Sequence, residues 1–188
     1  MCKRLISSCF VSLCLLVAGS TAAAQEVVHA LTGTVVNVNP QSKSMVVNTD
    51  DGSSGQFALA DPNSRLDFNR AVKDEVKPAA NFDKTNEQVI VLYYGDSTVR
   101  TAVGVQDLGA GPFVKTQGTV VKTNKHDHTI TLKDGSGKTV TIHMAPNSLA
   151  DTTDGVMPGE RFEPSKGDTV NVVATNQNGV EQGLFLHD

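Results

Sequence analysis

The chain has 188 residues, a formal net charge of −4, no tryptophan and only 5% aromatic residues. This length corresponds to one or two small domains. The low aromatic content, with many threonine, valine, asparagine and glycine residues, argues against a helical bundle and favours short β-strands. The three cysteines (Cys2, Cys9 and Cys14) all lie in the first 14 residues.

The first 24 residues are predicted to be a secretory signal peptide. They contain a basic start at Lys3 and Arg4, an apolar stretch over residues 5–18, and small residues before a cleavage site. We expect cleavage between Ala24 and Gln25. The alternative is an uncleaved anchor, but the stretch is short and serine-rich for a membrane-spanning helix. The sequence therefore predicts a periplasmic or secreted protein.

Cleavage at this point would leave a mature chain without cysteine. Disulfides, thiolate metal sites and cysteine nucleophiles are then excluded together. The formal charge becomes −6, because 14 basic residues remain against 20 acidic ones. This balance argues against nonspecific nucleic-acid binding. No later segment approaches the roughly 18 apolar residues that a spanning helix needs.

The remaining sequence repeats itself at an offset of 83 to 85 residues. Each copy opens with Gly-Thr-Val-Val, continues through an apolar stretch and an Asp-Gly-Ser turn, and reaches a Pro-Asn-Ser tripeptide. The matching segments, first copy before second, are 33–36 and 118–121, 45–47 and 130–132, 51–53 and 134–136, and 62–64 and 146–148. An offset that holds over four separate matches indicates an internal duplication.

Apolar and polar residues alternate in each copy, which is typical of half-buried antiparallel strands. Residues 134–137 supply a glycine-rich hairpin turn. After the first three strands we expect a break in which Asn63 and Ser64, or Asn147 and Ser148, cap a short helical turn. The later strands of each copy are predicted over 56–60, 88–94 and 98–105, and over 139–145, 169–175 and 180–187.

Five short strands with an interruption between the third and fourth favour a partly open Greek-key barrel of the OB type. The predicted fold is all-β, with two tandem five-stranded OB-like Greek-key barrels related by internal duplication. The first barrel is expected over residues 25–107, a Gly- and Pro-rich linker over 108–114, and the second barrel over 115–188. Each copy is near the lower size limit for a self-sufficient core, so we expect the barrels to pack together.

The order of these motifs is G-T-V-V, a D-G hairpin, K-G-D-x-V-x-V and a closing N-G-V strand. It resembles small exported bacterial β-barrel domains of unknown function. More distantly, it is similar to the periplasmic copper-binding barrels of metal-efflux systems, which hold their metal with a histidine, two methionines and a stacked tryptophan. That metal motif is absent here, because the chain has no tryptophan and Met45, Met144 and Met157 form no close pair.

The histidines of the second copy are the most suggestive candidate site. In an extended segment His126 and His128 would point to the same face, and His143 would approach His128 across the hairpin. Three imidazoles are a suitable ligand set for Zn²⁺ or Cu²⁺. The alternative is a solvated hairpin whose histidines are simply exposed polar side chains, and in that case no cofactor is bound.

Two further groups are candidate interaction residues. Lys122 and Lys133 belong to a lysine cluster on the early strands of the second copy, which would suit an anionic polymer or simply protect an edge strand. Tyr93 and Tyr94 end the fourth strand of the first copy. If that strand alternates, one of the two points outward and contacts a ligand or the second barrel.

The sequence contains no recognisable catalytic motif. Asp50, Asp51, Asp151 and Asp154 would bind Ca²⁺ only weakly, because no EF-hand spacing is present, and 151–155 is expected to be a solvated loop. We therefore expect an exported, non-enzymatic binding or interaction module of the bacterial cell envelope, with an envelope protein or anionic polymer as possible partner and nucleic acid disfavoured. The alternative is a periplasmic Zn or Cu protein that uses His126, His128 and His143.

Overall fold

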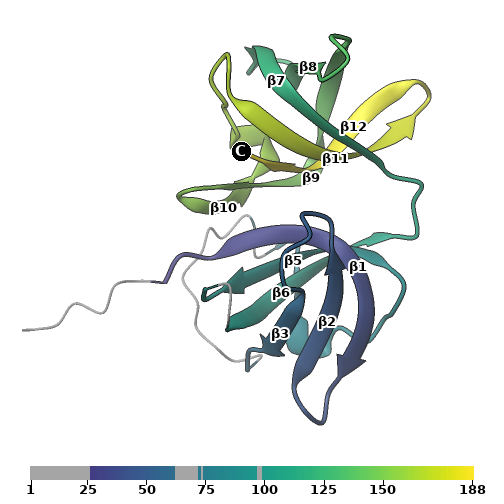
Figure 1. Ribbon diagram of the computed structural model, residues 1–188, viewed down its shortest axis with the longest axis vertical. Helices are drawn as coiled ribbons and strands as arrows, with labels where there is room; N and C mark the ends of the chain where they lie inside the picture. Colours follow the sequence, from purple (N-terminus) through teal and green to yellow (C-terminus); the bar gives the residue numbers. More distant parts are fainter. Residues whose placement is uncertain (1–25, 62–71, 73, 97–98) are drawn as a thin grey trace, which may run out of the picture.

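The computed structural model describes residues 26–61, 72, 74–96 and 99–188. The predicted signal peptide, the Pro62-Asn63-Ser64 tripeptide and the start of the predicted strand 98–105 lie outside the described residues. The described chain is all-β, with two sheets stacked along the long axis of the molecule (Figure 1). The strands are β1 (His29–Asn39), β2 (Ser44–Thr49), β3 (Gln56–Leu59), β4 (Lys77–Pro78), β5 (Gln88–Tyr94), β6 (Arg100–Gly109), β7 (Val114–Asn124), β8 (Thr129–Asp134), β9 (Thr139–Thr152), β10 (Gly155–Pro158), β11 (Thr169–Gln177) and β12 (Val180–His187).

The first sheet closes into a barrel. Its strands follow the order β3-β2-β1-β5-β6, and a parallel pairing of β3 with β6 completes the ring. The other pairings in the ring are antiparallel, and the short β4 adds to the outer edge of β6. This connectivity is the Greek-key order expected of an OB-like barrel.

The second sheet repeats this order with β9-β12-β11-β7-β8. A parallel pairing of β12 with β9 takes the place of the β3–β6 pairing, and β8 pairs with β9. The predicted all-β fold with OB-like barrels is therefore confirmed. No helix in the described part of the chain has the length and hydropathy of a transmembrane segment.

The two barrels share a bulge at the same place in the Gly-Thr-Val-Val motif. The register of β1 against β2 shifts at Val36, and the register of β7 against β8 shifts at Val121. A bulge leaves one residue unpaired and increases the local twist of the strand. As a result both valines point outward, with exposed fractions of 57% and 38%.

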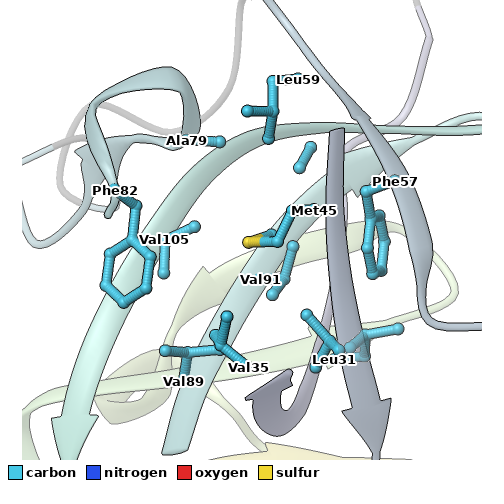
Figure 2. Close-up of a cluster of buried hydrophobic side chains, with 12 residues drawn as sticks. Leu31, Val35, Met45, Phe57, Leu59, Ala79, Phe82, Val89, Val91 and Val105 are labelled. Atoms are coloured by element: carbon cyan, nitrogen blue, oxygen red, sulfur yellow. The ribbon is translucent and has the colours of Figure 1, made fainter. Parts of the chain in front are cut away.

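Three apolar clusters hold the fold together. The first fills the first barrel, where the side chains of Met45, Phe57 and Val91 point toward a common centre (Figure 2). The second fills the second barrel around Ile130 and Leu132. The third combines residues of both sheets and lies between the barrels: Val28, Ala30, Val72, Ile90, Leu92, Leu149, Val156, Val173 and Phe185. The barrels therefore pack together through a continuous apolar contact.

One local prediction is wrong. Asn147 and Ser148 do not cap a helical turn, because β9 continues through them to Thr152 and then turns back as β10. The buried Ser148 hydroxyl donates a hydrogen bond to the Ala145 carbonyl at 2.6 Å, which satisfies it inside the strand region. The short 3₁₀ turn of the second barrel instead follows β10, at Gly159–Arg161.

Candidate functional site

The β9–β10 hairpin forms the junction between the barrels. It lies on the side of the second barrel that faces β1 and β5 (Figure 1). The Val156 N–H donates to the Val28 carbonyl at 2.8 Å, so β10 is hydrogen-bonded to the chain just before β1. Close by, the Gln106 side-chain amide donates to the Asn147 carbonyl at 2.9 Å. These bonds fix one barrel on the other and place the outer face of the second barrel against the first.

That outer face carries two parallel rows of side chains, because outward residues of neighbouring strands are in register. The first row is apolar, and its register pairs join Leu149 to Phe185 and Phe185 to Val173. All three belong to the cluster between the barrels. The second row is polar and lies at the next outward-facing residue of each strand, two residues from the first row. It consists of Asp151 on β9, His187 on β12, Asn171 on β11 and Gln117 on β7.

A groove of about 470 Å³ lies along these rows. All four residues of the polar row line it, together with Val173 and Phe185 of the apolar row. The first barrel contributes the opposite wall through β1 residues 30–32, the loop residues Asp50 and Asp51, and Tyr93. The groove is therefore built jointly by both barrels, and most of its wall comes from rigid strands.

Asp151 is the most buried polar residue of the groove, with 4% exposure. The His29 imidazole lies across the junction, with Nδ1 at 3.2 Å from Oδ1 and 3.3 Å from Oδ2. Burial raises the pKa of Asp151 to about 6, although His29, the Ala30 N–H and the nearby His187 all favour the ionised form. The expected solvated loop over 151–155 is therefore only partly correct, because Asp151 is a buried strand residue and the exposed turn is limited to Thr153 and Asp154.

Asp50 closes the rim of the groove. Its carboxylate accepts hydrogen bonds from Lys115 Nζ at 2.6 Å and from Gln88 Nε2 at 2.7 Å. The neighbouring Asp51 has a lowered pKa: burial raises it, but the hydrogen bonds from Ser53 and Thr49 and the Arg100 charge together lower it more. Asp50 and Asp151 thus each face a cationic or ionisable partner: Lys115 in the groove wall, and His29 next to the lining residue Ala30.

Tyr93 and Tyr94 are both half-buried. The Tyr93 ring lines the groove, lies edge-on to Phe57 at 5.8 Å and stands under the Arg100 guanidinium, which is 4.8 Å from the ring centre. Burial raises the pKa of its phenol, an effect that the Arg100 charge opposes. Of the two predicted tyrosines, Tyr93 is the one that the structure places at the groove.

The three histidines predicted as metal ligands, His126, His128 and His143, lie away from this groove. Residues 125–128 form a turn rather than an extended segment, and His128 has a positive φ of 48°. The His126 side chain is 96% exposed, and its Nδ1 lies 2.9 Å from the adjacent Asp127 carboxylate. His143 pairs with Thr129 across the hairpin. In the part of the chain that the structure describes, no group of three or more His, Cys, Asp or Glu side chains is placed to hold a metal ion.

The predicted lysines are also separate from the groove. Lys122 and Lys133 are exposed on β7 and β8. Another lysine of β7, Lys115, lies instead at the groove rim.

The residues of the polar row could not be singled out from sequence. His29 and Asp151 are 122 positions apart and meet only because the hairpin crosses between the barrels. Asn171 and Gln117 are ordinary outward residues of alternating strands. Only the alignment of outward positions between strands, which depends on register, joins them in one row.

Comparisons with known proteins add little to this geometry. No protein-family model matches the chain, and no curated protein sequence matches it either. Among solved structures, the crystal structure of Ag(I)CusF is similar, with 13% sequence identity and a TM-score of 0.31. The match covers 40% of this chain and 96% of that one. At this level the likeness supports no conclusion about function.

Proposed function

We propose that this chain is an exported, non-enzymatic binding module of the bacterial cell envelope whose ligand occupies the groove between the two barrels. The groove itself is the observation that carries the proposal. Its volume of about 470 Å³ falls within the range of about 300–1,000 Å³ that is typical of small-molecule sites. The wall combines apolar surface with a few convergent polar groups, as such sites usually do.

The way the groove is built supports a binding role. The polar row stands on strands whose positions are fixed by pairing, and Asp151 is held by His29 and the Ala30 N–H. A site on rigid elements loses little conformational freedom when the ligand binds. Export is supported by the predicted signal peptide, and a binding rather than catalytic role by the lack of a catalytic motif in the sequence.

A ligand screen with a blocked groove tests this proposal. Asn171→Trp places a large side chain in the groove, whereas Thr169→Trp places it on the same exposed face two residues along β11. Thermal unfolding is followed with a panel of sugars, organic amines, organic anions, Zn²⁺ and Cu²⁺. We expect at least one solute to raise the unfolding temperature of the wild type and of Thr169→Trp but not of Asn171→Trp. Equal responses in all three proteins, or no response to any solute, would contradict the proposal.

A further inference from the structure

We infer that the groove takes a neutral saccharide of one or two rings, bound along the polar row Gln117–Asn171–His187–Asp151 with its ring packed on Tyr93 and Phe185. This inference rests on the proposed function and adds the chemical class of the ligand. It is drawn from the charge balance, the hydrogen-bonding groups and the apolar surface of the groove.

The charge balance of the groove favours an uncharged ligand. Asp50 is bonded to Lys115 and Asp151 to His29, so neither carboxylate needs a cationic ligand to neutralise it. An anionic ligand would place its charge beside Asp50, Asp51 and Asp151, which line the groove from both barrels. Introducing a like charge among them is unfavourable, and displacing Lys115 would leave Asp50 without its ion pair.

The polar row offers the hydrogen-bonding groups that hydroxyls require. Gln117 Nε2 donates to Asn171 Oδ1 at 3.0 Å, which orients both amides. The bond leaves the Gln117 carbonyl oxygen as an acceptor and the Asn171 amide nitrogen as a donor, and both side chains are exposed to the groove. His187 follows on the next strand, about 4.8 Å farther along. Alternating planar donors and acceptors suit a ligand with several hydroxyls, each of which donates and accepts.

The remaining surface of the groove is apolar and includes an aromatic ring. Val173 and Phe185 lie beside the polar row, and Tyr93 lies on the opposite wall. A sugar ring has hydroxyls at its edge and a face of C–H groups, so it can satisfy the polar row while it packs on this apolar surface. A wholly apolar ligand would leave the polar row unpaired, which costs binding free energy.

Amide chemical-shift mapping on the purified ¹⁵N-labelled protein tests the inference. The probes are maltose and N,N′-diacetylchitobiose as neutral saccharides, spermidine as a cation and citrate as an anion. We expect a saccharide to shift the amides of Gln117, Asn171 and Tyr93 in a saturable way. The double variant Gln117→Ala/Asn171→Ala should weaken that binding roughly tenfold or more, since it removes two hydrogen-bonding side chains.

The matched control is Thr119→Ala/Thr169→Ala, which alters the neighbouring register pair on the same two strands outside the groove. It should leave the saccharide affinity within about twofold of the wild type. If only spermidine or citrate shifts the groove amides, the saccharide inference is wrong and the groove still binds small molecules. If none of the probes or other small solutes shifts them, the proposed function fails as well. If the two double variants weaken saccharide binding equally, the polar row is not the site.

Discussion

The two barrels have the same strand order but differ after their third strand. In the first barrel this strand, β3, has 4 residues, whereas its counterpart β9 has 14 and continues into the hairpin with β10. That extension brings Leu149 and Asp151 against the first barrel. The shared strands thus build two separate cores and part of the interface, while the β9–β10 extension adds Leu149 and Val156 to the interface and Asp151 to the groove.

The largest effect is expected when this interface is broken. Phe185→Ala removes the aromatic centre of the cluster between the barrels, and Phe57→Ala removes its equivalent from the core of the first barrel. Both side chains are buried, so each variant should lose about 3–5 kcal/mol of unfolding free energy. Only Phe185→Ala should uncouple the barrels.

Tyrosine fluorescence and circular dichroism together detect that uncoupling. Both tyrosines of the chain are in the first barrel and there is no tryptophan, so fluorescence reports that barrel alone. In urea, the two signals should coincide for the wild type and for Phe57→Ala but separate for Phe185→Ala. Coincident transitions in Phe185→Ala would show that this side chain does not couple the barrels.

The carboxylates of Asp151 and Asp51 should make the free energy of unfolding depend on pH in opposite directions. Asp151 at the junction has a pKa raised from 3.8 to about 6, so the folded state binds more protons than the unfolded state between these values. The free energy of unfolding therefore falls as pH rises through this window, by at most about 3 kcal/mol. His29, His187 and Tyr93 face this carboxylate from β1, β12 and β5. Asp151→Asn should abolish that decline.

Asp51 on the first barrel provides the contrast. Its pKa is lowered, so its contribution to stability is present above the unfolded pKa of 3.8 and disappears as pH falls below it. Asp51→Asn should change stability near neutral pH and have little effect in strong acid. Both predictions are checked by measuring the urea unfolding midpoints of Asp151→Asn, Asp51→Asn and the wild type from pH 3 to 8. The same pH profile in Asp151→Asn as in the wild type would show that Asp151 does not titrate in this range.

The matched glycines of the Gly-Thr-Val-Val motif should give a smaller difference in unfolding free energy between the two barrels. A Cβ on Gly33 would lie 2.5 Å from the Asn48 carbonyl oxygen and 2.6 Å from Val47 Cγ1, whereas a Cβ on Gly118 would meet its nearest atom, the Lys133 oxygen, at 2.9 Å. Overpacking of this kind costs about 1–3 kcal/mol. The loss of unfolding free energy should lie at the upper end of this range for Gly33→Ala and at the lower end for Gly118→Ala. Equal urea midpoints for the two variants would show that this difference in space has no effect on stability.

The fold was predictable from sequence because the pattern of each strand occurs in two matching segments of the sequence. The alternation around Ile130 and Leu132 indicates a half-buried strand, and the match to Met45–Val47 gives its counterpart independent support. The bulges at Val36 and Val121 were not predictable, because a bulge leaves the residue order unchanged and alters only the pairing. The β9 extension was missed because Pro146 suggested that the strand ended there.

The groove was much less predictable than the fold. Tyr93 was named as one of a tyrosine pair at the end of a strand, where alternation turns one of the two outward. Its ring packs on the core of the first barrel beside Phe57 and also lines the groove. His29, Asn171 and Gln117 carry no such local signal, and Asp151 was assigned to a solvated loop. Their grouping depends on cross-strand register and on the packing of one barrel on the other. The histidines at 126, 128 and 143 were selected because they are close in sequence, but the first two lie in a turn and only His143 is on a strand.

The smallest effect is expected at the rim, where Lys115 and Asp50 join the barrels by an ion pair of 2.6 Å. The Lys115 side chain is 53% exposed, and such pairs contribute about 0–1 kcal/mol. Lys115→Ala leaves Asp50 bonded to Gln88, so it should lower the unfolding free energy by less than about 1 kcal/mol, and by even less in high salt.

Lys125→Ala is the matched control, because Lys125 forms an exposed ion pair with Glu163, and both residues belong to the second barrel. The two variants should be indistinguishable in urea unfolding at low and high salt. A much larger and salt-independent loss for Lys115→Ala would mean that the rim pair holds the barrels together. The expected result instead assigns that role to the apolar row and the β9–β10 hairpin, and leaves Lys115 to balance the charge of the groove.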